Sequence, residues 1–423
     1  MSVEKHTLDN GATVLIDHMP NSQTTAMSYT FRVGSRFETA EENGLAHFFE
    51  HMAFKGTKNR DVTALNKEMD DLGARSNAFT SKEVTSYHMH GLNEDAFKFN
   101  EIEADMAMNL TLPADELEKE RGVILEEIKR SEDNNSSVLI NAVFDTLYSG
   151  QAMGRTVLGP SENIKSFDRD MFDAFRAKHY HAGNLIVSVA GGCDPAKILQ
   201  DIKDKVADMP TGERSVFDPA QYVGGNCEIV KPTQQVSLAV AFEAASTDDP
   251  KDEIAESILS KVLSGGMSSR LFTEIREKRS LVYGVAAGFS HSLDTGLFIA
   301  QAGTSPEKVS QLIPVLCDEL NKLRQEPVSD EEFNRAKKLF RSHIAMEADA
   351  SSASRMTSNM MEFNMHQRIE TVEDFMARVD SVTKDDVMEA ARRVFSTKPS
   401  YVSVGPEKPN ESEQIAMRMG FEL

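Results

Sequence analysis

Hydrophobic and polar positions follow two periods along the chain, and the segments with each period interleave. Apolar and polar residues alternate at 25–33 and 237–242, a pattern that is typical of β-strands. Apolar residues recur at helical spacing in four longer segments, at 43–54, 64–72, 115–129 and 330–346. Because helices and strands are mixed throughout, the pattern predicts an α+β fold in which helices pack in layers against sheets.

The two halves of the chain resemble each other. Residues 112–128 are similar to 327–344, and 46–56 can be aligned with 255–265. The strand around Val187 resembles the one around Val402, and each runs into a glycine. Since these matches occur in the same order in both halves, we predict a duplication that gives two homologous mixed α/β domains of about 200 residues.

A segment without periodicity separates the halves. Residues 209–226 contain two prolines and three glycines, which favour a linker. This predicts an N-terminal domain at 1–208 and a C-terminal domain at 227–423. An ordinary surface loop inside one large domain is the alternative.

Composition excludes several classes of protein. The 423 residues include 46 basic and 67 acidic side chains, and the net charge of −21 argues against a nucleic-acid-binding surface. The apolar runs are far shorter than the roughly 20 residues of a membrane span. The polar start predicts no secretory signal. The three cysteines do not suggest a disulfide framework, so we expect a cytoplasmic location.

The most specific chemical pattern is a histidine pair near the start of the chain. On a helix, His47 and His51 are one turn apart and project from one face, where both imidazoles could bind one Zn²⁺. Glu50 lies near the same face and could accept a proton from a water at the metal. This is the H-x-x-E-H pattern of inverted zinc-peptidase motifs. The alternative is a chance grouping on a solvated helix face, although the apolar flanks indicate partial burial.

A catalytic zinc requires a third protein ligand and an open position. On the helix predicted at 115–129, Glu120 and Glu127 are two turns apart and share a face, whereas Glu126 is rotated away. We predict that Glu127 is the third ligand and that Glu120 orients a ligating histidine. An amphipathic helix with acidic surface positions is the structural alternative.

The repeat provides an internal comparison. In the second half, His47, Glu50 and His51 align with Glu256, Leu259 and Ser260, and Glu127 aligns with His343. The second domain therefore lacks the ligand set, and we predict one metal site per chain.

Together these residues resemble the pitrilysin-like inverzincin metallopeptidases, in particular the branch of mitochondrial processing peptidase and its bacterial relatives. The similarity extends over essentially the whole chain. It is carried by the metal motif, by Glu127 and by four further stretches, at 44–57, 76–87, 158–164 and 268–283.

The resemblance implies zinc-dependent hydrolysis of peptides, with His47, His51 and Glu127 as ligands and Glu50 as general base. It implies that Arg276 and Tyr283, in the second half, bind substrate and stabilise the oxyanion. It also implies that substrate adds as a strand along an edge strand containing Asn77, Ala78 and Phe79. His88 and His90 on the following strand could compete as zinc ligands, but we interpret them as structural.

Members of this family enclose substrate between two such two-domain halves, so the chain is expected to form half of a clamshell chamber. We expect a homodimer in which Arg276 and Tyr283 act at the partner's zinc, or a heterodimer with a metal-free paralogue. A catalytically idle peptide-binding or assembly subunit is the alternative function. Asn141 stands where the processing peptidases have an acidic residue, while Asp145 is retained, which favours a broader oligopeptide preference than presequences alone.

Overall fold

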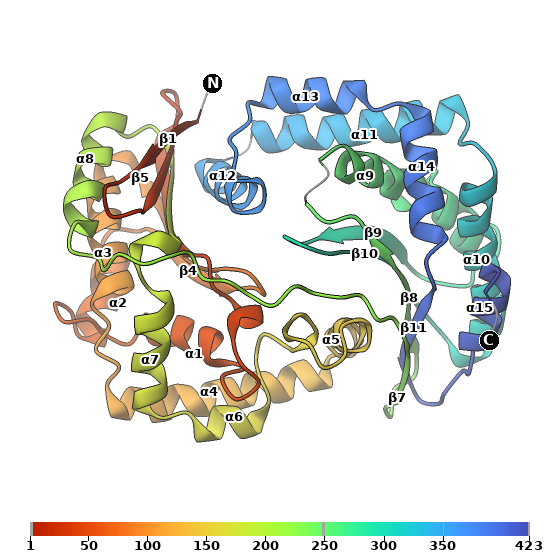
Figure 1. Ribbon diagram of the computed structural model, residues 1–423, viewed down its shortest axis with the longest axis horizontal. Coiled ribbons are helices and arrows are strands. Elements are labelled where there is room, and N and C mark those ends of the chain that lie inside the picture. Colours follow the sequence, from red (N-terminus) through yellow and green to blue (C-terminus); the bar gives the residue numbers. More distant parts are fainter. Residues whose placement is uncertain (1–2, 248–249, 350, 422–423) are drawn as a thin grey trace. The chain divides into compact units, whose positions relative to one another are not determined.

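One mixed sheet organises each of two units of the chain (Figure 1). The computed structural model describes residues 3–247, 250–349 and 351–421. The first unit comprises Met1–Arg130, Arg155–Asp218 and Glu347–Thr371, and the second comprises Ser131–Gly154, Pro219–Met346 and Val372–Leu423. Each unit has its own apolar core, formed where helices pack against its sheet.

The first sheet has the strand order β1-β2-β6-β3-β5-β4, in which β2 and β6 are parallel and all other neighbours are antiparallel. Its strands are β1 (Glu4–Thr7), β2 (Thr13–His18), β3 (Thr24–Phe31), β4 (Arg75–Thr80), β5 (Thr85–Leu92) and β6 (Leu185–Gly191). Helices of this part of the chain are α1 (Leu45–Met52), α2 (Val62–Asp71), α3 (Ala96–Met108), α4 (Ala114–Asp133), α6 (Ser161–Ser166), α7 (Arg169–His179) and α8 (Pro195–Val206).

The second sheet repeats this topology without a counterpart of β1. Its order is β7-β11-β8-β10-β9, with β7 and β11 parallel and the other neighbours antiparallel. The strands are β7 (Asn226–Val230), β8 (Val236–Ala244), β9 (Val285–His291), β10 (Gly296–Thr304) and β11 (Ser400–Gly405). The accompanying helices are α9 (Pro250–Ser264), α10 (Val309–Gln325), α11 (Asp330–Ala348), α13 (Val372–Ser381), α14 (Lys384–Phe395) and α15 (Ser412–Met419).

The predicted fold class is confirmed. The strands expected at 25–33 and 237–242 are β3 and β8, and the four expected helices are α1, α2, α4 and α11, with ends that differ by up to four residues. Strands β6 and β11, which contain the matched Val187 and Val402, occupy equivalent places in the two sheets. The repeat is therefore visible in the topology as well as in the sequence.

Each unit contains one helix from the opposite half of the sequence. Helix α5 (Asn135–Leu147) packs on β7, β8 and β11, and α12 (Ser352–His366) packs on β2, β3 and β6. In the first unit, Arg355 on α12 forms an ion pair with buried Asp17, and Ser188 donates a hydrogen bond to the Met356 carbonyl at 2.9 Å. The periodicity did not reveal this exchange. The domain boundary predicted from the repeat stays a prediction.

Close backbone contacts hold the N-terminus of α1. Gly44, in the left-handed region at φ +105°, precedes the helix, and the buried Glu38 carboxylate accepts hydrogen bonds from the backbone amides of Gly44 and Ala46 at 3.0 and 2.6 Å. A Cβ on Gly159, at φ +72°, would lie 2.3 Å from the Asn43 carbonyl oxygen. Glycine at position 159 therefore lets the backbone of the 158–164 stretch lie directly against the start of this helix.

We expect Gly159→Ala to destabilise the protein more than Gly150→Ala. Both glycines have a left-handed φ, +72° and +73°, so alanine is strained at either position, but a Cβ on Gly150 meets nothing within 4 Å. The added overlap should lower the free energy of unfolding by about 2 kcal/mol more for Gly159→Ala. Thermal unfolding of the two variants measures the difference, and equal shifts in Tm would show that the close approach is not needed.

Candidate metal centre

Helix α1 presents its two histidines from a well-packed scaffold. Leu45, Phe48, Phe49 and Met52 are fully buried in the core of the first unit. The opposite face is thereby fixed toward α4 and β4. The imidazoles of His47 and His51 lie on that face, with their ring centroids 4.7 Å apart.

Glu127 on α4 completes a group of three ligand side chains. Its Oε2 lies 3.7 Å from His47 Nε2 and 3.6 Å from His51 Nε2. Tetrahedral zinc with ordinary bond lengths separates its ligand atoms by about 3.4 Å. Among the described residues, these three are the only group of histidine, cysteine or acidic side chains with ligand atoms gathered this closely, within 4.8 Å. The donor set and its spacing fit one Zn²⁺ ion.

The charges around the group favour a cation. Burial, together with the neighbouring His51, lowers the pKa of His47 to about 4, so this imidazole is neutral at physiological pH. Burial also acts to lower the pKa of His51, but Glu127 and Glu120 outweigh it and raise that pKa. Contact with His51 lowers the pKa of Glu127, so this side chain is an ionised carboxylate at neutral pH. Two imidazoles and one anion are the donors that zinc commonly takes.

Glu120 holds one histidine in a defined orientation. Its Oε2 lies 3.0 Å from His51 Nδ1, which leaves His51 Nε2 toward Glu127. Its other oxygen, Oε1, lies 2.7 Å from the ammonium of Lys55, so each carboxylate oxygen of Glu120 has a partner that holds it in place. The orienting role of Glu120 stays a prediction, and the sequence gave no signal for Lys55.

Glu50 is close to the ligands and is tied to the edge strand. Burial raises the pKa of the Glu50 carboxyl. A 2.6 Å hydrogen bond that Thr80 Oγ1 donates to Glu50 Oε2 acts in the opposite direction but does not cancel the increase. Thr80 is the last residue of β4, which in the described part of the chain is hydrogen-bonded only to β5 and is an edge of the sheet. Thr80 lies in a stretch that carries the family resemblance, but sequence reasoning did not single it out.

The residues of β4 alternate between the two faces of the sheet. Thr80 and Ala78 share the face that carries Glu50, and Ala78 packs against the apolar core there. Asn77 and Phe79 lie on the opposite face, and Asn77 is paired across the strands with His88.

His88 and His90 of β5 lie on that opposite face as well, because paired residues of neighbouring strands point the same way. Neither belongs to the metal-ligand group. Burial lowers the pKa of both imidazoles. Their interpretation as structural residues agrees with this placement.

The equivalent position in the second unit contains an ion network. Glu256 on α9 is fully buried, and its carboxylate contacts His291 Nε2 at 2.8 Å and Arg393 at 2.9 Å. His343, which aligns with Glu127, is exposed on α11. Within the described part of the second unit, no group of metal-ligating side chains is found. That the chain binds a single metal stays a prediction.

Arg276 and Tyr283 also lie in the second unit, Arg276 within a π-helical turn, Phe272–Glu277, and Tyr283 in the segment that follows it. The Arg276 guanidinium lies over the rings of Phe272 and Tyr283, 4.6 and 5.3 Å from their centroids. Tyr283 is 88% exposed. The two residues thus contact each other, and their role toward a metal in the first unit stays a prediction.

Comparison with known proteins identifies the class. Residues 13–161 match the family described as "Insulinase (Peptidase family M16)", and 166–340 match "Peptidase M16 inactive domain". All three ligand residues fall within the first range. The chain belongs to peptidase family M16, the pitrilysin-like family that the sequence resembled.

Relatives extend over nearly the whole chain. An "Uncharacterized zinc protease" of Rickettsia felis is 36% identical over 94% of this chain and 96% of that protein. The "Mitochondrial-processing peptidase subunit beta" of Pongo abelii is 31% identical over 91% of this chain and 81% of the relative. A crystal structure of a protease from Helicobacter pylori has a TM-score of 0.87 at 22% identity, over 96% of this chain and 100% of the other, and so shares the fold.

We expect Glu120→Gln to weaken zinc binding. Loss of the carboxylate removes the charged acceptor that holds His51 Nδ1, and changes of this kind cost about tenfold or more in metal affinity. The dissociation constant for Zn²⁺ can be measured by competition with a chromogenic chelator. Glu118→Gln is the matched control, because Glu118 lies on the same helix and pairs with Arg121 at the surface. Equal zinc affinities for the two variants would contradict this orienting role.

Proposed function

We propose that the protein is a zinc-dependent endopeptidase that hydrolyses peptides or unfolded oligopeptides. The observation that carries the proposal is the grouping of His47, His51 and Glu127 around one point, with the partly buried carboxyl of Glu50 beside them. The names of the relatives as zinc proteases support the same metal.

In this proposal, a Zn²⁺ ion held by the three ligands would supply Lewis-acid chemistry, acidifying a water and polarising the scissile carbonyl. Glu50 Oε1 takes the proton from the water whose oxygen attacks the carbonyl carbon. As the C–N bond breaks, the same carboxyl gives that proton to the leaving amine nitrogen. The raised pKa of Glu50 makes it a stronger base, and the bond from Thr80 keeps its carboxylate oriented.

The edge strand supplies a place for substrate. In this proposal, a peptide adds beside β4 through main-chain hydrogen bonds, next to Asn77, Ala78 and Phe79. Because Thr80 ends β4 and bonds Glu50, a peptide along this edge passes the general base. Strand addition uses main-chain hydrogen bonds, which any unfolded peptide can form whatever its side chains. It therefore suits unfolded peptides of varied sequence better than folded proteins.

We expect Glu50→Gln to abolish peptide cleavage while zinc stays bound. The amide has nearly the same shape but cannot accept the proton, so kcat should fall by about 10³-fold. Fluorogenic peptide turnover and metal content by elemental analysis give the two readouts. Glu126→Gln is the matched control, because Glu126 is exposed and its ion pair among the described residues is with Lys129 at the surface. Unchanged turnover in Glu50→Gln would contradict the mechanism, and a zinc-loaded wild-type protein that cleaves no peptide would favour the alternative assembly or peptide-binding role.

The complete site is proposed to need two chains. Arg276 and Tyr283 of one protomer would act at the metal centre of the other, in a homodimer or, alternatively, in a heterodimer with a metal-free paralogue. Together the chains would enclose the substrate in a chamber. The cytoplasmic location stays a prediction; among the described residues, no helix combines the length and apolarity needed to cross a bilayer.

We expect inactive variants of the two kinds to restore activity when mixed. In a dimer of Glu50→Gln with Arg276→Ala, one of the two sites combines an intact Glu50 with an intact Arg276. Random re-pairing of equal amounts should therefore give about a quarter of the wild-type turnover. Each variant alone is the control. If the mixture stays as inactive as its parts, Arg276 does not act across a homodimer.

A further inference from the structure

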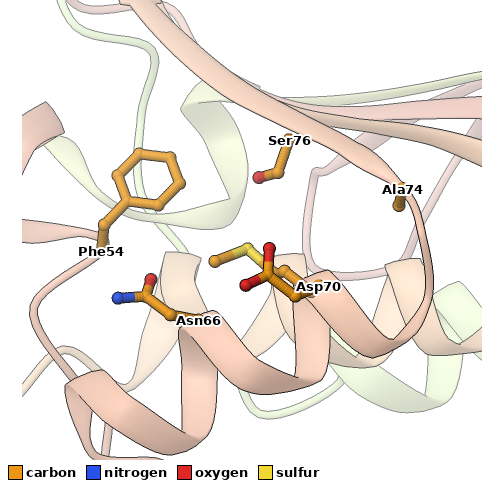
Figure 2. A pocket seen from close by; sticks show the side chains of 6 residues that line it. Phe54, Asn66, Asp70, Ala74 and Ser76 are labelled. Carbon is orange, nitrogen blue, oxygen red and sulfur yellow. The ribbon is translucent and has the colours of Figure 1, made fainter.

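A pocket of about 410 Å³ opens beside the start of β4, at the opposite end of the strand from Glu50. It is lined by residues of α2, by Phe54 after α1, by Ala74 just before β4, and by Ser76 of β4. Figure 2 shows the Phe54 ring, the Asp70 carboxylate and the Ser76 hydroxyl directed toward the same space. The full lining is Phe54, Asn66, Met69, Asp70, Ala74 and Ser76.

The pocket lies on the same side of β4 as Glu50. Ser76 and Thr80 are four residues apart, so their side chains point to one face of the strand, and Thr80 bonds Glu50. The separation along the strand is about 13 Å. A peptide added along this edge would place one side chain in the pocket, three to five residues from the peptide bond beside Glu50.

Of the six residues that line the pocket, only Asp70 carries a formal charge, and Asn66 and Ser76 are neutral groups that can donate or accept hydrogen bonds. Within the described part of the chain, the side chains of Asn66, Asp70 and Ser76 have no hydrogen-bond or ion-pair partner. Asp70 supplies the formal charge. The nearby basic residue of β4, Arg75, belongs to the other face of the strand. The pocket is therefore electrostatically suited to a cationic group.

The walls suit a long side chain that ends in such a group. Phe54 offers an aromatic face, on which a guanidinium can stack, and Met69, which is 8% exposed, offers an apolar surface for methylene groups. A side chain of alanine or serine would leave most of the volume unfilled.

We propose that this pocket is a specificity site for an arginine or lysine side chain of the substrate, with Asp70 as the residue that pairs with its charge. The inference rests on the proposed function, because it takes β4 as the strand on which substrate lies. It adds a preference at one position distant from the cleaved bond.

The test compares peptides that differ only in charge at one position. A fluorogenic series has arginine, isosteric neutral citrulline or apolar norleucine at each of the second to sixth residues on either side of the cleaved bond. At one position, three to five residues from that bond, wild-type protein should show kcat/KM about fivefold higher for arginine than for citrulline. High salt should reduce this ratio because the pocket is open.

Two variants show whether the preference for arginine depends on Asp70. The arginine-to-citrulline ratio should fall to about one in Asp70→Asn and stay at the wild-type value in Asp71→Asn. Asp71 is the neighbouring residue of α2, is not part of the pocket, and pairs with Lys67 at the surface. A ratio that is the same in Asp70→Asn as in wild type, or a preference for norleucine at this position, would overturn the proposal.

Binding separates this inference from the proposed function. Fluorescence anisotropy of the labelled arginine and citrulline peptides is measured with Glu50→Gln protein. If wild type cleaves none of the peptides, the proposed function fails. The pocket would still be supported if the arginine peptide binds more tightly than the citrulline peptide and Asp70→Asn abolishes that difference. Equal affinities for both peptides would overturn the pocket, whatever the cleavage result.

Discussion

The contact between α1 and α4 is the interaction on which the candidate site depends. Each helix alone offers an incomplete set: two imidazoles on one, two carboxylates on the other. Brought together, Glu127 meets both histidines and Glu120 fixes His51, while Lys55 fixes Glu120 in turn. His47 is the buried member of this group, and a bound metal would compensate the burial of its imidazole, which supports its proposed role as a ligand.

The scaffold explains why these two helices meet. Helix α1 is held on one side by buried aromatic residues and at its start by the Glu38 carboxylate. Gly44 and Gly159 let the 158–164 stretch approach the same end. Arg121 on α4 donates to the Phe167 carbonyl at 2.8 Å, which anchors α4 to the segment following α6. In the second unit the same topology holds Glu256, His291 and Arg393 in a network of opposite charges, so the fold alone does not create a metal centre.

Much of this could be predicted from the sequence, because the signals were local or repeated. The spacing of His47 and His51, and of Glu120 and Glu127, fixes which helix faces they share, and the repeat showed which half lacked the ligands. Contacts made by single residues over long distances left no such signal. Thr80, Lys55 and the exchange of α5 and α12 between the units depend on tertiary packing, which periodicity does not report. The pocket at Asp70 likewise arises only when α2 and β4 meet.

The most direct test of the account is the position of zinc in crystals of the metal-loaded protein, located by anomalous diffraction at the zinc absorption edge. The account predicts one zinc per chain, bound by Nε2 of His47, Nε2 of His51 and a carboxylate oxygen of Glu127, with a fourth position open to solvent beside Glu50. A zinc bound elsewhere, a Glu127 carboxylate turned away from the metal, or a fourth protein side chain closing that position would contradict it.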